Sequence, residues 1–114
     1  MEDCLFCKII AGEIPSTKVY EDDMVYAFND IAPQAPCHVV IVPKVHIASA
    51  NEITPENSAC VSRIFEVVPK IAKGLGFAEN GYRVVNNCGE DGLQSVKHLH
   101  FHLMGGRKFS WPAG

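Results

Sequence analysis

Three histidines occupy alternate positions near the C-terminal end of the chain, at His98, His100 and His102. Imidazole titrates near neutral pH, so these side chains can act as nucleophiles, proton carriers or hydrogen-bond partners without extreme tuning of their pKa. Because alternate residues of a β-strand point to the same face, the spacing predicts that the three rings lie in a row. Leu99 and Phe101, which stand between them, would then face an apolar core.

This row of histidines allows three interpretations. It could be a solvated sheet face that happens to be rich in histidine. It could bind a metal ion, although strand geometry separates the two outer residues by about 13 Å, which prevents all three rings from reaching one ion easily. It could carry acid–base and nucleophilic chemistry. Phosphoryl or nucleotidyl transfer suits the third interpretation, because one nitrogen can take the phosphorus while its neighbours stabilise the oxygens.

The pair Cys4 and Cys7, spaced as CxxC, is the second chemical motif. It could be a redox pair, although no strand precedes it and no βαβ pattern surrounds it. It could be two buried thiols on the inner face of a short helix, or half of a zinc site that two histidines complete. Cys37, Cys60 and Cys88 have no close partner in the sequence, and five cysteines make a poor disulfide framework, which favours a reducing compartment.

Local patterns predict the elements that must position these motifs. A short helix is expected over 4–11, with Asp3 as its N-cap. A long helix is expected over 54–75, with a kink or break at Pro69. Strands are expected at 18–21, 24–29, 38–42, 82–86 and 98–104. This order of elements predicts an α+β domain with a mostly antiparallel sheet.

Length and charge narrow the class of protein. A chain of 114 residues predicts a single domain spanning 1–114. The 10 basic and 13 acidic residues give a net charge of −3, so neither nucleic acid nor an anionic membrane surface is expected as a partner. The N-terminal residues lack a signal-peptide pattern, and the longest apolar run, 39–42, is too short to span a membrane. We therefore expect a cytoplasmic protein.

Taken together, the motifs resemble those of the histidine triad (HIT) family, and within it the Hint branch. The resemblance covers nearly the whole chain. Besides the histidine row, it is carried by Glu13-Ile14-Pro15, Asp30-Ile31-Ala32-Pro33-Gln34-Ala35-Pro36, Pro43-Lys44, Gly81-Tyr82-Arg83, Gln94-Ser95-Val96, Gly105-Gly106-Arg107 and Trp111-Pro112. It implies a mostly antiparallel five-stranded sheet with one long and one short helix. It also implies a homodimer in which two sheets join and each C-terminal tail reaches the partner's site.

For mechanism, the resemblance implies a hydrolase of nucleoside phosphoramidates and related purine nucleotides. His100 would attack the α-phosphorus to form a nucleotidyl-histidine, and water would then release the nucleoside monophosphate. His102 would bond the phosphate oxygens, and Ser95 would contact the phosphate or assist the leaving amine. His98 and His38 would orient and buffer the nucleophile. The alternatives are a purine-nucleotide binding or regulatory protein with incidental hydrolysis, and a metal-binding interaction module.

The resemblance also implies a nucleotide pocket and a metal site. Asp30 would accept bonds from the ribose hydroxyls, and Asn87 would lie on the phosphate side. The other implied binding positions, besides Ser95 and the last two histidines of the row, are Phe6, Ile9, Phe28, Ile31, Gln94, Val96 and Trp111. Some bacterial members of the family hold a structural zinc, and the matching residues here are Cys4, Cys7, His46 and His98. Leu93 stands where the family pattern usually has a glycine.

Overall fold

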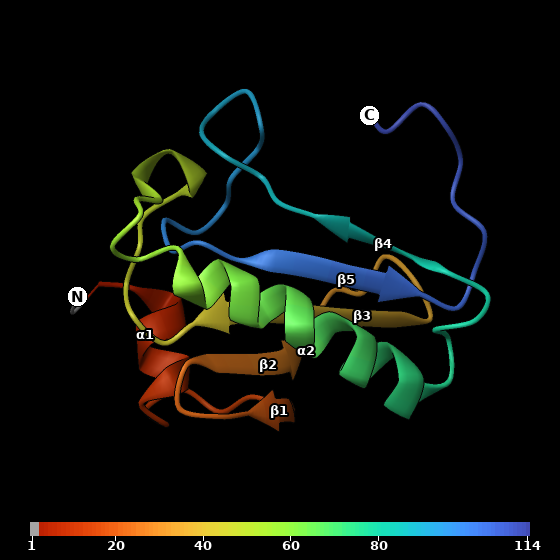
Figure 1. Cartoon of the computed structure of the whole chain (residues 1–114), viewed down its shortest axis with the longest axis horizontal. Helices are drawn as coiled ribbons and strands as arrows, with labels where there is room; N and C mark the ends of the chain where they lie inside the picture. The colour runs from red at the N-terminus through yellow and green to blue at the C-terminus, as the bar shows by residue number, and fades with distance from the viewer. Residues whose placement is uncertain (1–2) are drawn as a thin grey trace.

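The computed structural model describes residues 3–114. It contains one five-stranded sheet and two α-helices (Figure 1). In chain order the elements are α1 (Leu5–Ile10), β1 (Lys18–Glu21), β2 (Val25–Asn29), β3 (Cys37–Pro43), the 3-10 turn η1 (Ala50–Glu52), α2 (Ala59–Leu75), β4 (Tyr82–Val85) and β5 (Phe101–Gly105). The strand order is β1-β2-β3-β5-β4, and all neighbours are antiparallel. The predicted α+β class and five-stranded antiparallel sheet are confirmed.

The central strand β3 is buried on both faces. Its Val39 and Ile41 pack with α2, whereas Val40 and Val42 pack with Phe6 of α1. Because side chains alternate along a strand, the two helices must cover opposite faces of the sheet. The sheet therefore has an α2 face, which carries the larger apolar core, and an α1 face. No helix within residues 3–114 is long and apolar enough to cross a membrane.

Helix α2 differs from its predicted form in two ways. It begins at Ala59 rather than at Thr54, because Asn57 holds the preceding segment as a separate turn: its side chain accepts from the Thr54 amide at 2.8 Å. The helix also continues through Pro69 without a break. Pro69 is exposed, and so is Phe65, whose carbonyl loses its amide partner to the proline. The missing bond therefore falls on the solvent side, where water can replace it.

The N-terminal helix and the last strand also begin later than predicted. Cys4, and not Asp3, is the N-cap of α1, since its Sγ accepts from the Cys7 amide at 3.3 Å. Strand β5 begins at Phe101 because the preceding segment bonds elsewhere: the Leu99 amide donates to the Ile47 carbonyl at 2.6 Å. The alternation of faces nevertheless persists through this segment. Its leucine and phenylalanine side chains enter the α2 core, and the histidine row lies on the α1 face.

Candidate active site

His100 is buried in the segment just before β5. Its Nδ1 lies 2.7 Å from the backbone carbonyl of His98. A carbonyl can only accept, so Nδ1 carries the hydrogen and Nε2 keeps its lone pair. Burial lowers the pKa of His100, and the carbonyl bond and the charge of Asp30 only partly oppose this effect. The ring is therefore held neutral with a free base at Nε2, which is the form a nucleophile needs.

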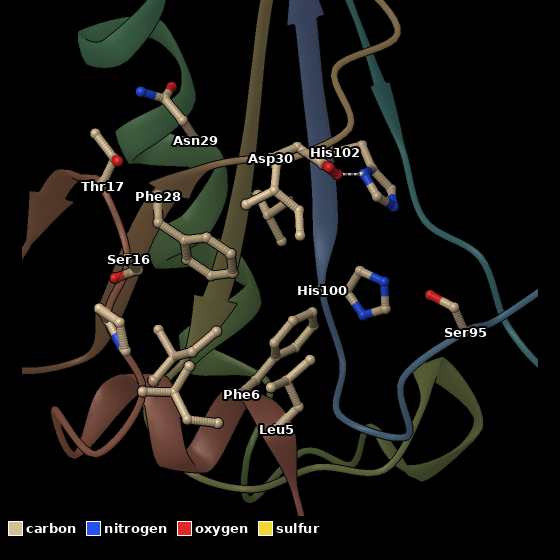
Figure 2. Close-up of a pocket in the computed structure, with 15 residues that line it drawn as sticks. Leu5, Phe6, Ser16, Thr17, Phe28, Asn29, Asp30, Ser95, His100 and His102 are labelled. Atoms are coloured by element: carbon tan, nitrogen blue, oxygen red, sulfur yellow. Dashed lines mark ion pairs between the residues drawn. The ribbon is translucent and has the colours of Figure 1, made fainter.

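A second group of side chains, the relay cluster, consists of Asp30, His38 and His102. The Gln34 amide donates to Nδ1 of His38 at 3.0 Å, so the hydrogen of that ring is on Nε2. This Nε2 lies 2.9 Å from Nδ1 of His102 and 3.4 Å from Oδ2 of Asp30. His102 therefore accepts at Nδ1 and offers an N–H at Nε2. Oδ2 of Asp30 also lies 3.9 Å from Nδ1 of His102. A dashed line marks this pair in Figure 2.

The electrostatics of the relay cluster favour neutral imidazoles. Burial is the largest influence on both His38 and His102, and it lowers the pKa of each ring. Asp30 raises both pKa values, but by less than burial lowers them. The short distance between the two ring nitrogens is a hydrogen-bond distance, so hydrogen bonding accounts for this arrangement. The cluster can thus present one oriented N–H donor beside His100.

A hollow of about 440 Å³ opens beside His100 and His102 (Figure 2). Its walls are mainly apolar and come from α1, from the segment that follows it, and from two strands: Leu5, Phe6, Ile9, Ile14, Phe28 and Val40. Ser95 lines the histidine end, and in Figure 2 Thr17 and Asn29 lie across the hollow from it. The volume is that of an ordinary small-molecule site. An apolar slot that ends in polar groups suits a flat ring attached to a charged group.

The structure brings most of the predicted nucleotide-binding residues to this hollow. Those that line it are Phe6, Ile9, Phe28, Asp30, Ile31, Ser95, His100 and His102. Gln94 does not, because its amide braces the loop by donating to the Ala48 carbonyl at 2.7 Å. Val96 packs against the α1 core, Asn87 lines a different hollow, and Trp111 is 82% exposed and lines neither.

Four further side chains form the thiol cluster: Cys4, Cys7, His46 and His98. One ligand atom from each lies within 4.8 Å of the others. Nδ1 of His98 is 3.3 Å from Sγ of Cys4 and 3.5 Å from Sγ of Cys7, and Nδ1 of His46 is 3.4 Å from Sγ of Cys7. The cluster can therefore hold a metal ion.

The hydrogen bonding of the thiol cluster fits that use. Nε2 of His98 donates to the Pro43 carbonyl at 2.9 Å, so its Nδ1 lone pair faces the sulfurs, as a metal-bound imidazole requires. Burial and the neighbouring Cys4 raise the pKa of Cys7 to about 11. A thiol with such a pKa is a poor redox nucleophile unless a cation stabilises its anion. Of the histidine row, only His98 belongs to the thiol cluster, whereas His102 belongs to the relay cluster.

The sequence-based prediction missed a second hollow, of about 300 Å³, on the other side of His102. Arg83 of β4, Arg107 and Phe109 line it together with His38. One signal was available: Arg83 and Val85 stand two residues apart in a predicted strand, which places both side chains on one face. The sequence alone does not specify which face of the sheet they occupy, because this depends on how the strands pair.

Comparison with known proteins shows the family. The family model described as the HIT domain matches residues 11–109 of the sequence. The chain is 50% identical over 113 residues to an uncharacterized HIT-like protein of Synechococcus elongatus, covering 99% of this chain and 98% of the relative. It is 47% identical over 106 residues to the purine nucleoside phosphoramidase of Escherichia coli, covering 93% and 89%.

Solved structures agree with this result. A histidine triad protein from Clostridium difficile superposes with a TM-score of 0.95 at 54% identity, covering 98% of this chain and 97% of that one. A HIT family hydrolase from Clostridium thermocellum gives a TM-score of 0.96 at 48% identity, covering 99% and 98%. The fold and the relatives together show that this protein is an enzyme of the hydrolase class. The chain belongs to the HIT family, and its structural neighbours are of the Hint type.

Proposed function

We propose that this protein hydrolyses nucleoside phosphoramidates and related purine nucleotides, with His100 as the nucleophile. The observation that carries the proposal is the neutral His100 ring, whose Nε2 is free and which lines a ligand-sized hollow. The 47% identity to the Escherichia coli purine nucleoside phosphoramidase supports the substrate class. The reaction product is a nucleoside monophosphate.

The proposed reaction has two steps. Nε2 of His100 bonds to the α-phosphorus, the P–N bond breaks, and its electron pair leaves with the amine, which takes up a proton. In the second step a water oxygen bonds to phosphorus as the N–P bond breaks, and its electron pair returns to Nε2 of His100, which restores the neutral ring. The water gives up one proton, which balances the proton that the amine takes up in the first step. The N–H of His102 stabilises the charge that grows on the phosphate oxygens in both steps. Ser95 contacts the phosphate or relays the proton to the amine.

The rest of the nucleotide follows from the shape of the hollow. The base lies between the apolar side chains of Phe6, Ile9 and Phe28. Asp30 accepts from the ribose hydroxyls: its Oδ1 already accepts from the Ala32 amide at 2.8 Å, which fixes the carboxylate at the rim of the hollow. Ile31 is fully exposed there and can close over a bound base.

We also propose that the metal of the thiol cluster is zinc. Two thiolates and two imidazole nitrogens are a ligand set that zinc prefers, and four protein ligands leave no open position. When bound, the ion supplies structural stability and takes no part in the reaction. The four residues themselves tie the start of α1 to the segment before β5. A homodimer is proposed as well, because β4 is an edge strand of the sheet and can pair with a second copy.

The proposed function is tested with the unsubstituted 5′-phosphoramidates of adenosine and guanosine as substrates. Chromatography measures the AMP or GMP that the protein releases from them. Mass spectrometry of acid-free quenched samples should find a nucleotidyl adduct on the peptide that holds His100. AMP binding measured by calorimetry without any turnover would instead favour a nucleotide-binding or regulatory protein. Light scattering on the intact protein gives its oligomeric state in the same preparation.

A further inference from the structure

The backbone of His100 lies just outside the ladders of the sheet. Strand β3 pairs with β5 as far as Phe101, and β4 pairs with β5 only as far as His102. His100 therefore has no strand partner on either side, although the proposed attack requires its ring to be placed accurately. A reacting group misplaced by about 1 Å can lose about a hundredfold in rate. Contacts other than strand pairing must hold this residue.

Asn86, the first residue after β4, provides such a contact on the β4 side. Its side-chain Nδ2 donates to the backbone carbonyl of His100 at 2.9 Å. Within residues 3–114 no backbone amide donates to this carbonyl. The side-chain amide thus replaces a strand backbone and extends the contact between β4 and β5 beyond the last pair.

The other anchors of this segment hold different atoms, and they come from β3 and the residues that follow it. The Leu99 amide donates to the Ile47 carbonyl at 2.6 Å, and Nε2 of His98 donates to the Pro43 carbonyl at 2.9 Å. The bond from Nδ1 of His100 to the His98 carbonyl fixes the ring. None of these bonds holds the peptide group that follows His100. Only the Asn86 bond does so.

That peptide group joins the proposed nucleophile to the strand that carries His102. The two rings lie 5.2 Å apart between their centres, and both line the first hollow (Figure 2). In the proposed reaction they act on the same phosphate, one by attack and the other by donation. Rotation of the peptide between them would turn His100 relative to His102. Because His100 is buried, a rotation that leaves its carbonyl without a donor is unfavourable.

We propose that Asn86 is a positioning residue for the nucleophile. Its amide holds the His100 carbonyl and thereby the direction from which Nε2 of His100 approaches phosphorus. The inference rests on the proposed function, because it is the attack by His100 that this geometry serves. Asn86 lines neither the first nor the second hollow. Its effect therefore belongs to the attack step and not to nucleotide binding.

The first variant, Asn86→Leu in the full-length protein, keeps nearly the same size and removes the donor. Rapid-quench measurements with unsubstituted adenosine phosphoramidate follow the nucleotidyl-histidine that forms in a single turnover. We expect its rate of formation to fall about ten- to a hundredfold. The Kd for AMP, measured by calorimetry, should stay within about twofold of the wild-type value, because the walls of the first hollow are unchanged.

The second variant, Asn86→Asp, adds a pH readout that a purely structural role would not change. An ionised carboxylate cannot donate, whereas a protonated carboxyl group has one O–H. The rate relative to wild type should therefore rise at least about threefold between about pH 7.5 and pH 5, since acid restores the donor. A charge effect on His100 and His102 would have the opposite sign. A carboxylate raises the pKa of nearby imidazoles, which would lower the relative rate in acid.

Asn80→Asp is the matched control. It makes the same change at an exposed asparagine that lines neither hollow, so its relative rate should stay near one at both pH values. A wild-type rate of nucleotidyl-histidine formation in Asn86→Leu overturns the inference. So does an Asn86→Asp variant that circular dichroism shows to be folded and whose relative rate does not rise in acid. This second measurement decides alone if Asn86→Leu does not fold. Wild-type protein without turnover overturns the proposed function itself, whereas active wild type with unaffected variants overturns only the role of Asn86.

Discussion

The thiol cluster and the relay cluster flank His100 and each contains two histidines, yet the hydrogen bonds of these histidines differ. In the thiol cluster, His98 donates to a backbone carbonyl and turns its lone pair toward two sulfurs. In the relay cluster, one ring donates to the next. The partner of each second nitrogen thus decides which atom is free, and hence whether a ring can hold a metal, donate or attack. Residue type alone does not distinguish these tasks.

The largest effect is expected at the ring between the two clusters. His100→Gln removes the nucleophilic nitrogen, so kcat/KM for adenosine phosphoramidate should fall at least about a thousandfold. Metal content, measured by atomic emission on the same sample, should not change, because His100 is not one of the thiol cluster's ligands. Retention of more than a tenth of the wild-type rate would rule His100 out as the nucleophile.

The next effect separates the relay cluster from the thiol cluster. His38→Phe removes the donor to Nδ1 of His102, so the hydrogen on Nε2 of His102 is no longer enforced. We expect kcat/KM to fall about ten- to a hundredfold, with metal content unchanged. His38→Gln is the control, since its amide can still donate, and it should recover part of the activity. Equal losses in both variants would show that the hydrogen bond is not what matters.

Cys7→Ser should have the reverse pattern. It removes a ligand of the thiol cluster, so metal content should fall and thermal stability should decrease. With metal at about a hundred times its Kd, the lost stabilisation is about 3 kcal/mol. Turnover should change less than tenfold, because Cys7 does not line the first hollow. Cys88→Ser, at a cysteine outside the cluster, is the control for both readouts. Metal-free wild-type protein of unchanged stability would contradict this prediction.

The smallest effect is the position of the acid limb of the pH profile. Burial lowers the pKa of His38 and His102 below the usual 6.5, so kcat/KM should stay high at pH 6.5 and fall only at lower pH. The same depressed pKa values mean that the stability from these neutral rings is present above pH 6.5 and is lost as pH falls through the folded-state values. Asp30→Asn removes a charge that raises both pKa values, so it should move the limb to still lower pH. A limb above pH 6.5 would contradict this assignment.

Much of the site could be predicted because its residues lie in regular patterns. Alternation of Leu99, Phe101 and Leu103 with the histidines predicted the two faces, and the structure has them. The helix start at Ala59 could not be found, since the helix-start signal at Thr54 belongs to a separate turn. The hydrogen bond between His38 and His102 could not be predicted either. These residues are 64 positions apart, and no local pattern encodes such a contact.

The position of Leu93 shows another limit. The sequence departs from the family pattern there, and the structure holds this exposed leucine at a φ of 60°, in the left-handed region that favours glycine. Such a backbone costs about 1 kcal/mol for a residue with a side chain. The loop therefore adopts the conformation that a glycine favours, although position 93 is a leucine. Propensity alone would not have predicted that conformation for this residue.

Helix α1 is six residues long, and Cys4 at its cap meets a histidine 94 positions further along the chain. A helix this short does not persist in water by itself, because nucleation costs more than its few hydrogen bonds return. During synthesis, α1 leaves the ribosome well before the segment around His98, and it must wait for that segment before its partner exists. The wall that α1 contributes to the first hollow therefore cannot be stabilised until that later segment has been made. A chain truncated before His98 would also lack β5, which joins β3 to β4, so it would lose both the continuous sheet and the histidines of the site.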